Sequence, residues 1–163
     1  MEAGNGKREA GVSAERRAIR SFEDLEVYRR SMELLVPLHA LVLTFPDYER
    51  FELASQLRRA SKSIPANVAE GYGKKRSSKE FKAYLGNALG SANEVIVHLK
   101  IAATLCYGDA HTIEELVSGY TIVAKQLHRL SEAWQDYESP ARPESRISHP
   151  ASRVQQARST DHE

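Results

Sequence analysis

The sequence is poor in cysteine, in long apolar runs and in net charge. Its one cysteine, Cys106, excludes an intrachain disulfide framework and a cysteine-rich metal site. No apolar run approaches the roughly 20 residues that a membrane-spanning helix needs, and residues 1–20 lack the apolar stretch of a signal peptide. The formal net charge of +1 gives no strong overall attraction to nucleic acid. These absences predict a cytoplasmic protein without a membrane partner.

Residues 1–21 and 139–163 are predicted to be disordered extensions. Both are rich in small, polar and charged residues and hold few large apolar side chains. They cannot bury enough surface to offset an ordering entropy of about 1–2 kcal/mol per residue. The segment 22–138 has fourteen basic and sixteen acidic side chains and enough apolar residues for one core. One folded domain is therefore expected over residues 22–138.

Two segments in the second half of this domain have clear helical periodicity. In the later one the intervals alternate between three and four residues, as in the seam of a helix bundle. Its stripe is Ile113, Leu116, Tyr120, Val123, Leu127, Leu130, Trp134 and Tyr137. The stripe of the earlier one is Phe81, Leu85, Ala88, Ala92, Val95, Leu99 and Ala102. Capping boxes are predicted at Thr112 with Glu115 and at Ser77 with Glu80.

The first two helical segments each contain a proline. One runs from Phe22 to about Thr44, and Pro37 predicts a mild kink or an interruption of one turn. The other runs from about Asp47 to Tyr72, and Pro65 predicts a bend. The stripe of the first is Leu25, Tyr28, Met32, Leu35 and Val42, with Leu34, Leu38, Leu41 and Phe45 beside it. That of the second is Leu53, Leu57, Ile64 and Val68. Gly71 and Gly73 are expected to end the second helix.

Four long helices with short connections predict an all-α fold. Antiparallel neighbours follow from the short connections, so we expect an up-down-up-down four-helix bundle with a Pro-kinked second helix. No alternation of period two is sustained, which argues against strands.

Sequence motifs over nearly all of residues 22–135 closely resemble the family of 23S rRNA-intervening-sequence proteins, also called four helix bundle proteins. The resemblance is carried, in this order, by FEDLEVYRRSMEL, FP and SQLRRASKSIPANVAEGYGKKRSSKEFKAYLGNALGSANEV. It implies a small bacterial protein that forms a kinked four-helix bundle and assembles as a barrel-shaped homopentamer. Some members are encoded within insertions in large-subunit ribosomal RNA genes. A related branch, the accessory variability determinants of diversity-generating retroelements, binds a reverse transcriptase and nucleic acid.

A group of basic residues is the candidate nucleic-acid-binding site. Its members are Arg58, Arg59, Lys62, Lys74, Lys75, Arg76, Lys79 and Lys82. A stripe of such cations suits contacts with phosphates rather than with base edges. The alternative is a solvated face with internal salt bridges to Glu52, Glu70 and Glu80. Tyr72 and Tyr84 are expected to lie in the core or in an interface. The alternative is that they stack on bases.

No set of residues predicts a reaction. The segment GYGKKRSS lacks the spacing of a phosphate-binding loop and follows no strand, so it is interpreted as a turn between helices. Glu94 and His98 share a helix face, but the repeated Glu-x-x-His pattern of di-iron bundles is missing. Cys106 is expected to be buried and inert. We expect no catalytic residue, no cofactor and no metal.

The sequence therefore predicts a non-enzymatic, homo-oligomeric scaffold or adaptor with weak RNA or DNA binding. Self-association is expected because several apolar residues lie outside the stripes, among them Val27, Val36, Phe51, Val97 and Leu105. The pentameric stoichiometry is implied by the resemblance alone. The alternative function is that of a retroelement accessory protein that binds a reverse transcriptase. A neighbouring reverse-transcriptase gene and a template repeat would be expected in that case.

Overall fold

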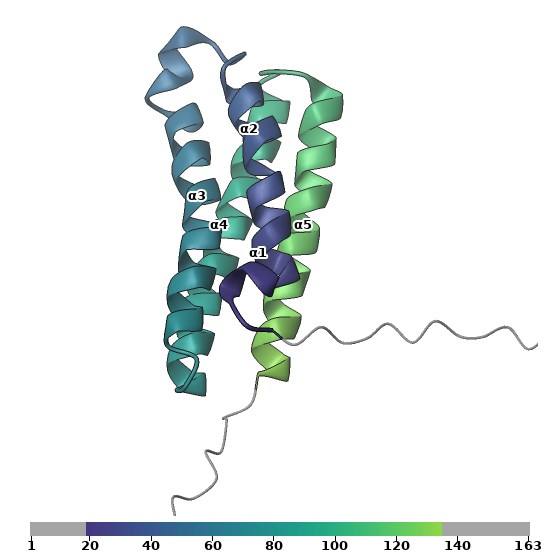
Figure 1. Cartoon of the computed structure of the whole chain (residues 1–163). Helices are drawn as coiled ribbons and strands as arrows, with labels where there is room; N and C mark the ends of the chain where they lie inside the picture. Colours follow the sequence, from purple (N-terminus) through teal and green to yellow (C-terminus); the bar gives the residue numbers. More distant parts are fainter. Residues whose placement is uncertain (1–18, 135–163) are drawn as a thin grey trace, which may run out of the picture.

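The computed structural model describes residues 19–134, and all regular elements in that range are helical. In chain order they are η1 (Phe22–Asp24), α1 (Glu26–Glu33), α2 (Leu35–Val42), η2 (Asp47–Arg50), α3 (Leu53–Gly73), α4 (Ser78–Thr104) and α5 (Ala110–Ala133), where η marks a 3-10 helix. The all-α four-helix bundle is confirmed, with α1 and α2 together forming its first helix (Figure 1). The predicted extensions, apart from residues 19–21, and the last four residues of the predicted domain lie outside the described residues.

The helices form a bundle in which each one contacts its neighbours along the chain. Helix α4 packs between α3 and α5, and the first helix lies against both α3 and α5. Figure 1 shows α1 and α2 in front and α4 behind. The core is therefore enclosed by four helical segments that alternate in direction.

The first bundle helix is interrupted at Leu34. Pro37 has no N–H to donate to the Glu33 carbonyl, and its ring crowds that carbonyl. The Leu34 N–H still donates to the Arg30 carbonyl at 3.2 Å, and the Leu38 N–H donates to the Leu34 carbonyl at 3.3 Å. The interruption predicted from Pro37 is confirmed, and it lies three residues before the proline.

The buried residues of the first helix agree with the predicted pattern except around Met32. The stripe members Leu25 and Val42 are buried, as are Leu38, Leu41 and Phe45 beside the stripe, whereas Tyr28, Leu34 and Leu35 are half-buried. Met32, which was predicted to be in the stripe, is 42% exposed. The neighbouring Ser31 is fully buried instead, and its hydroxyl donates to the Tyr28 carbonyl at 2.7 Å. The hydrophobic pattern therefore missed one polar residue at a core position.

Helix α3 begins at Leu53, later than the predicted start at Asp47, because residues 47–50 form the separate 3-10 helix η2 after Pro46. The Leu53 N–H donates to the Glu49 carboxylate at 3.1 Å. The helix continues through Pro65 without interruption, and the bend there stays a prediction. It ends at Gly73, whereas Gly71 lies inside it, so the predicted role of Gly71 in ending the helix is wrong.

The predicted seams of α4 and α5 are confirmed within the described residues. All seven members of the α4 stripe are at most 1% exposed. In α5 the buried members are Ile113, Leu116, Tyr120, Val123 and Leu127. Leu130 and Trp134 pack against this core while half-buried, and Tyr137 lies outside the described residues.

Side-chain caps begin both of these helices. The Ser77 hydroxyl accepts the Glu80 N–H at 3.3 Å, so the predicted cap of α4 is confirmed. Helix α5 is instead capped by Asp109, whose carboxylate accepts the backbone N–H and the hydroxyl of Thr112, each at 2.8 Å. These two hydrogen bonds lower the pKa of the Asp109 carboxyl. The cap predicted at Thr112 is wrong because Gly108, with φ +72°, turns the chain so that the helix begins one turn earlier.

Gly71 marks the closest approach of α3 to α4. A Cβ at this position would lie 2.7 Å from the Tyr84 Cβ and 3.0 Å from Cδ2 of Phe81. The Tyr84 Cβ is bonded to the backbone and cannot rotate away. Any larger residue at position 71 must therefore push the two helices apart.

We predict that Gly71→Ala lowers the free energy of unfolding by about 1–3 kcal/mol, the usual cost of overpacking. The matched control is Gly86→Ala in α4, where an added Cβ would meet no atom within 4 Å. That control should stabilise the helix by about 0.5–1 kcal/mol. Urea unfolding followed by circular dichroism measures both values, and a Gly71→Ala protein as stable as the wild type would show that the helices are not in tight contact.

Candidate nucleic-acid interface and exposed apolar surfaces

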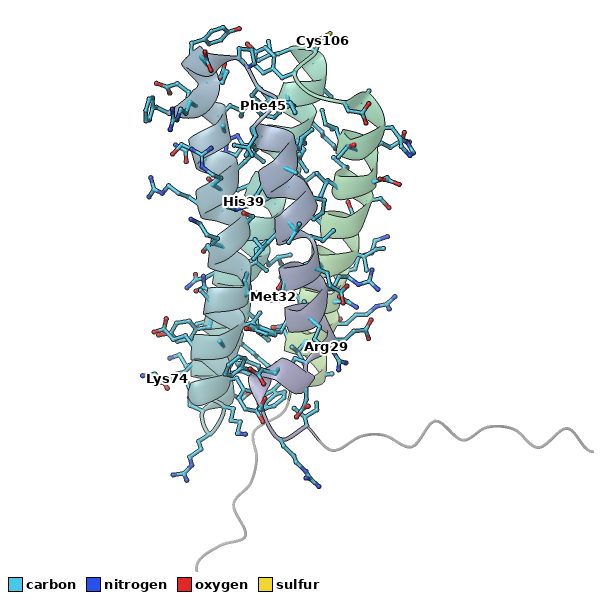
Figure 2. The ribbon with its side chains drawn as sticks, turned by 45° about the horizontal axis from the view of Figure 1, so that its top comes forward. Arg29, Met32, His39, Phe45, Lys74 and Cys106 are labelled. Carbon is cyan, nitrogen blue, oxygen red and sulfur yellow. The ribbon has the colours of Figure 1, made fainter. Side chains whose placement is uncertain are left out.

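The structure divides the eight predicted basic residues into two groups. The α3 cluster consists of Arg58, Arg59 and Lys62, in the first half of α3. The turn cluster consists of Lys74, Lys75, Arg76, Lys79 and Lys82, around the connection from α3 to α4. Twelve residues of helix, or about 18 Å, separate Lys62 from Lys74. Figure 2 shows Lys74 at the end of the bundle, far from the middle where His39 lies. The eight cations therefore do not form one continuous patch.

The turn cluster faces solvent. Four of its five members are exposed, and Lys75 is half-buried with its Nζ 3.8 Å from the centre of the Tyr72 ring. Within residues 19–134 no carboxylate lies within ion-pair distance of any of the eight basic side chains. The internal salt bridges expected with Glu52, Glu70 and Glu80 are therefore not formed in the described bundle. The positive charge of the turn cluster remains available to an external anion.

The two tyrosines near this cluster are engaged within the protein. Tyr72 is buried, which confirms its interpretation as a core residue. Tyr84 is half-buried and donates its hydroxyl to the Glu70 carboxylate at 2.8 Å. This hydrogen bond raises the pKa of the Tyr84 hydroxyl. Both side chains thus have structural partners that account for their positions.

A row of hydrogen bonds explains the polar residues of the SIPANVAEG segment. The Asn67 amide donates to the carbonyl and the hydroxyl of Ser63, at 2.8 and 3.0 Å. The Ser91 hydroxyl of α4 donates to the Ser63 hydroxyl at 2.9 Å. Together with the Tyr84–Glu70 bond, these contacts join α3 to α4 along one side. The structure therefore supports a packing role for Asn67, Glu70 and Gly71.

The α3 cluster lies beside the first helix. Burial lowers the pKa of His39 in α2, and the charges of Lys62 and Arg58 lower it further. The Nε2 atom of His39 is buried without a hydrogen-bond partner in the described part of the chain. Arg58 also donates to the Arg50 carbonyl at 2.8 Å. Arg58 is therefore in contact with η2, and the charges of both Arg58 and Lys62 act on His39.

An apolar groove separates the first helix from α3. Its lining includes Tyr28, Met32, Leu35, Pro65 and Ala66, with Lys62 at its rim. We call this surface the basic groove, after Lys62 in its lining. Figure 2 places Met32 and His39 along this side of the first helix. Sequence periodicity missed the groove because it assigned Met32 to the core.

A second surface lies on the other side of the first helix. It is formed by one face of α5, lined by His111, Glu114, Glu115, Ser118, Gly119 and Ile122. We call it the acidic face. Ile122 is partly exposed there, and a Cβ at Gly119 would lie 2.7 Å from a methyl group of Leu34. This surface could not be predicted from the sequence, because the periodicity of α5 does not show which of its residues face α2.

Other apolar side chains are exposed around the bundle. Val36 and Leu43, on the outer side of α2, are 76% and 83% exposed. Phe51, Val97 and Leu105 are exposed as predicted. Val27, which was predicted to lie outside the core, is 4% exposed and belongs to it. The described bundle therefore leaves apolar surface on several sides.

The histidines and the cysteine form no evident catalytic centre in the described residues. No group of three or more His, Cys, Asp or Glu side chains in residues 19–134 is placed to bind a metal ion. His98 contacts Glu94 at 3.5 Å, and His128 contacts Glu132 at 3.6 Å. Cys106 is exposed with φ 56°, because α4 ends before it, so its predicted burial is wrong. The absence of enzymatic activity stays a prediction.

A protein family and a solved structure are similar to this chain. The family model of the 23S rRNA-intervening sequence protein matches residues 23–129. A similar solved structure is a protein of unknown function from the S23 ribosomal protein family of Bacteroides thetaiotaomicron VPI-5482. The two chains are 25% identical with a TM-score of 0.58, over 65% of this chain and 95% of the other. No curated protein matches.

None of the described helices has the length and apolar character required to cross a membrane. The family match covers more than half of the chain and includes α1 to α4 and most of α5. It confirms the resemblance carried by the SIPANVAEG segment and its neighbours. The chain belongs to the 23S rRNA-intervening sequence protein family.

Proposed function

We propose that this protein is a non-enzymatic, homo-oligomeric scaffold that contacts RNA or DNA phosphates through its turn cluster. The observation that supports the proposal most directly is the gathering of five cations around one turn without an internal ion pair in the described bundle. Lysine and arginine at the end of a bundle provide phosphate contacts that do not depend on base sequence.

The exposed apolar side chains support self-association. Val36 and Leu43 lie on the outer side of α2, and no other part of the described bundle covers them. A second copy that covers them would remove this surface from water, at about 25 cal/mol per Å² of apolar area. Each added copy would also repeat the turn cluster, so several weak phosphate sites would act together. A pentamer is the stoichiometry that the family resemblance implies.

A reverse-transcriptase partner is supported by the resemblance alone. The near-neutral charge of segment 22–138 suits a weak nucleic-acid contact better than the strong affinity expected of a retroelement accessory protein. The scaffold with a phosphate-binding end is therefore the preferred proposal.

Self-association predicts a solution mass well above that of the 18.3 kDa chain. Light scattering coupled to size-exclusion chromatography at micromolar concentration measures this mass. A pentamer would give about five times the chain mass. A monomer mass under these conditions would contradict the proposed oligomer.

Phosphate binding by the turn cluster predicts a specific effect of charge removal. We expect Arg76→Ala with Lys79→Ala to weaken binding of a fluorescent single-stranded oligonucleotide about tenfold at low salt, because two exposed cations are removed. The slope of log K against log salt should also become shallower, by about 0.7 for each phosphate that the variant no longer binds. Fluorescence anisotropy over a salt series measures both quantities.

The control for this titration is Arg50→Ala with Lys100→Ala, which removes the same charge from exposed positions near the opposite end of the bundle. It should change the affinity by less than about threefold. Absence of wild-type binding at low salt, or an equal decrease in both double variants, would refute a phosphate site at the α3–α4 turn.

A further inference from the structure

We propose that His39 is a pH-sensitive switch, which keeps α2 packed on α3 while the ring is neutral and releases α2 locally when the ring is protonated. The inference concerns the stability of the first helix and depends on neither the proposed phosphate binding nor the proposed self-association. It is supported by the enclosure of one ring nitrogen, the charges around the ring, the break in the first helix and the different surroundings of the other described histidines.

One nitrogen of the His39 ring is enclosed without a hydrogen-bond partner. The side chain is half-buried on the side of α2 toward α3 (Figure 2), and its Nε2 atom is buried with no partner among the described residues. A neutral ring carries a proton on only one nitrogen, whereas the imidazolium carries an N–H on both. Protonation would therefore bury a charged donor without an acceptor, which costs far more than an unpaired neutral nitrogen.

The charges around His39 oppose a positive charge on its ring. The charged groups that act on it are Lys62 and Arg58, both in α3. Helices α1 and α5, which also pack against α2, contribute no charge that acts on the ring. Among the described residues no carboxylate lies within ion-pair distance of it. Burial and the two cations therefore hold the pKa of His39 below its ordinary value of 6.5.

The lowered pKa makes the packing of α2 dependent on pH. In a released α2 the ring would regain its ordinary pKa, so the released form binds a proton more readily than the packed form. The contribution of neutral His39 to the packed form is therefore complete above pH 6.5, and it is lost as the pH falls through 6.5 toward the lower pKa of the packed form. Mild acidification shifts the balance toward the released form.

The break in the first helix lets α2 respond as a separate unit. Helix α2 has eight residues and is joined to α1 at Leu34, where the helix is interrupted. Pro37 in its first turn has no backbone N–H, so fewer hydrogen bonds connect α2 to the preceding helix. A short helix that depends on packing is the kind of element that opens locally. Its release would expose Leu38, Leu41 and Val42, which are buried in the core.

The other described histidines differ from His39 because each lies beside a carboxylate. His98, His111 and His128 lie 3.5, 3.4 and 3.6 Å from the carboxylates of Glu94, Glu115 and Glu132. A proton on any of these rings would complete an ion pair within α4 or α5. Acidification is thus expected to weaken the packing of α2 while the α3–α4 hairpin and α5 stay in place.

Hydrogen–deuterium exchange of the full chain, followed by mass spectrometry, tests this proposal. After correction for intrinsic exchange rates, we expect the protection of residues 35–42 to fall several-fold between about pH 7.5 and about pH 5, while that of α4 and α5 does not fall. The variant His39→Gln, whose side chain does not titrate, should lose this decrease. Unchanged protection of α2 in the wild type, an equal decrease in His39→Gln, or a decrease spread equally over α4 and α5 would overturn the proposal.

Each variant is compared with itself at the two pH values, so a general change in stability does not imitate the switch. The matched control is His111→Gln in α5, which makes the same substitution at an exposed histidine and should leave the response of α2 as in the wild type. Lys62→Gln removes one of the two cations at an exposed position and should make the decrease smaller. An undiminished decrease in Lys62→Gln would contradict the role of the α3 charges. The measurement requires neither an oligomer nor bound nucleic acid, so its failure would leave the proposed function intact.

Discussion

The close packing of α3 against α4 is the contact on which the other parts of the structure depend. Gly71 leaves no space for a Cβ beside Tyr84, and the Ser63–Ser91 hydrogen bond joins the helices farther along. Ala88 and Ala92 of α4 are fully buried, and such small side chains let helices approach closely. This hairpin holds the turn cluster at one end of the bundle. It also provides the frame against which α5 and the first helix pack.

The first helix completes the core and separates the basic groove from the acidic face. It lies against α3 on one side and α5 on the other, so the basic groove is formed only when it is in place. The interruption at Leu34 allows Pro37 to be accommodated while the buried stripe from Val27 to Phe45 continues. The fold thus links a local constraint from one proline to the surfaces available for assembly.

Much of the fold could be predicted from the sequence, because uniform apolar stripes in α4 and α5 leave little ambiguity. Within the predicted stripe of the first helix only Met32 was misplaced, since Ser31 is polar and hydrophobicity alone favours Met32 at the neighbouring position. The cap of α5 was misplaced because Asp109 and Thr112 are both good capping residues. The basic residues looked like one site in the sequence, but the length of α3 separates them. Both this separation and the contact of α5 with Leu34 depend on how the helices pack. Helical periodicity in the sequence does not show that packing.

The central physical claim is that copies of this chain associate through apolar side chains that the described bundle leaves exposed. Hydroxyl-radical footprinting with mass spectrometry tests it directly, because Leu43 is 83% exposed in the single chain and would be covered by a second copy. Exposed Cys106, in the turn between α4 and α5, serves as the internal reference (Figure 2). We predict that Leu43 is oxidised several-fold more slowly at micromolar than at nanomolar protein concentration, with Cys106 equal in both. Equal rates of Leu43 oxidation would contradict self-association through this surface.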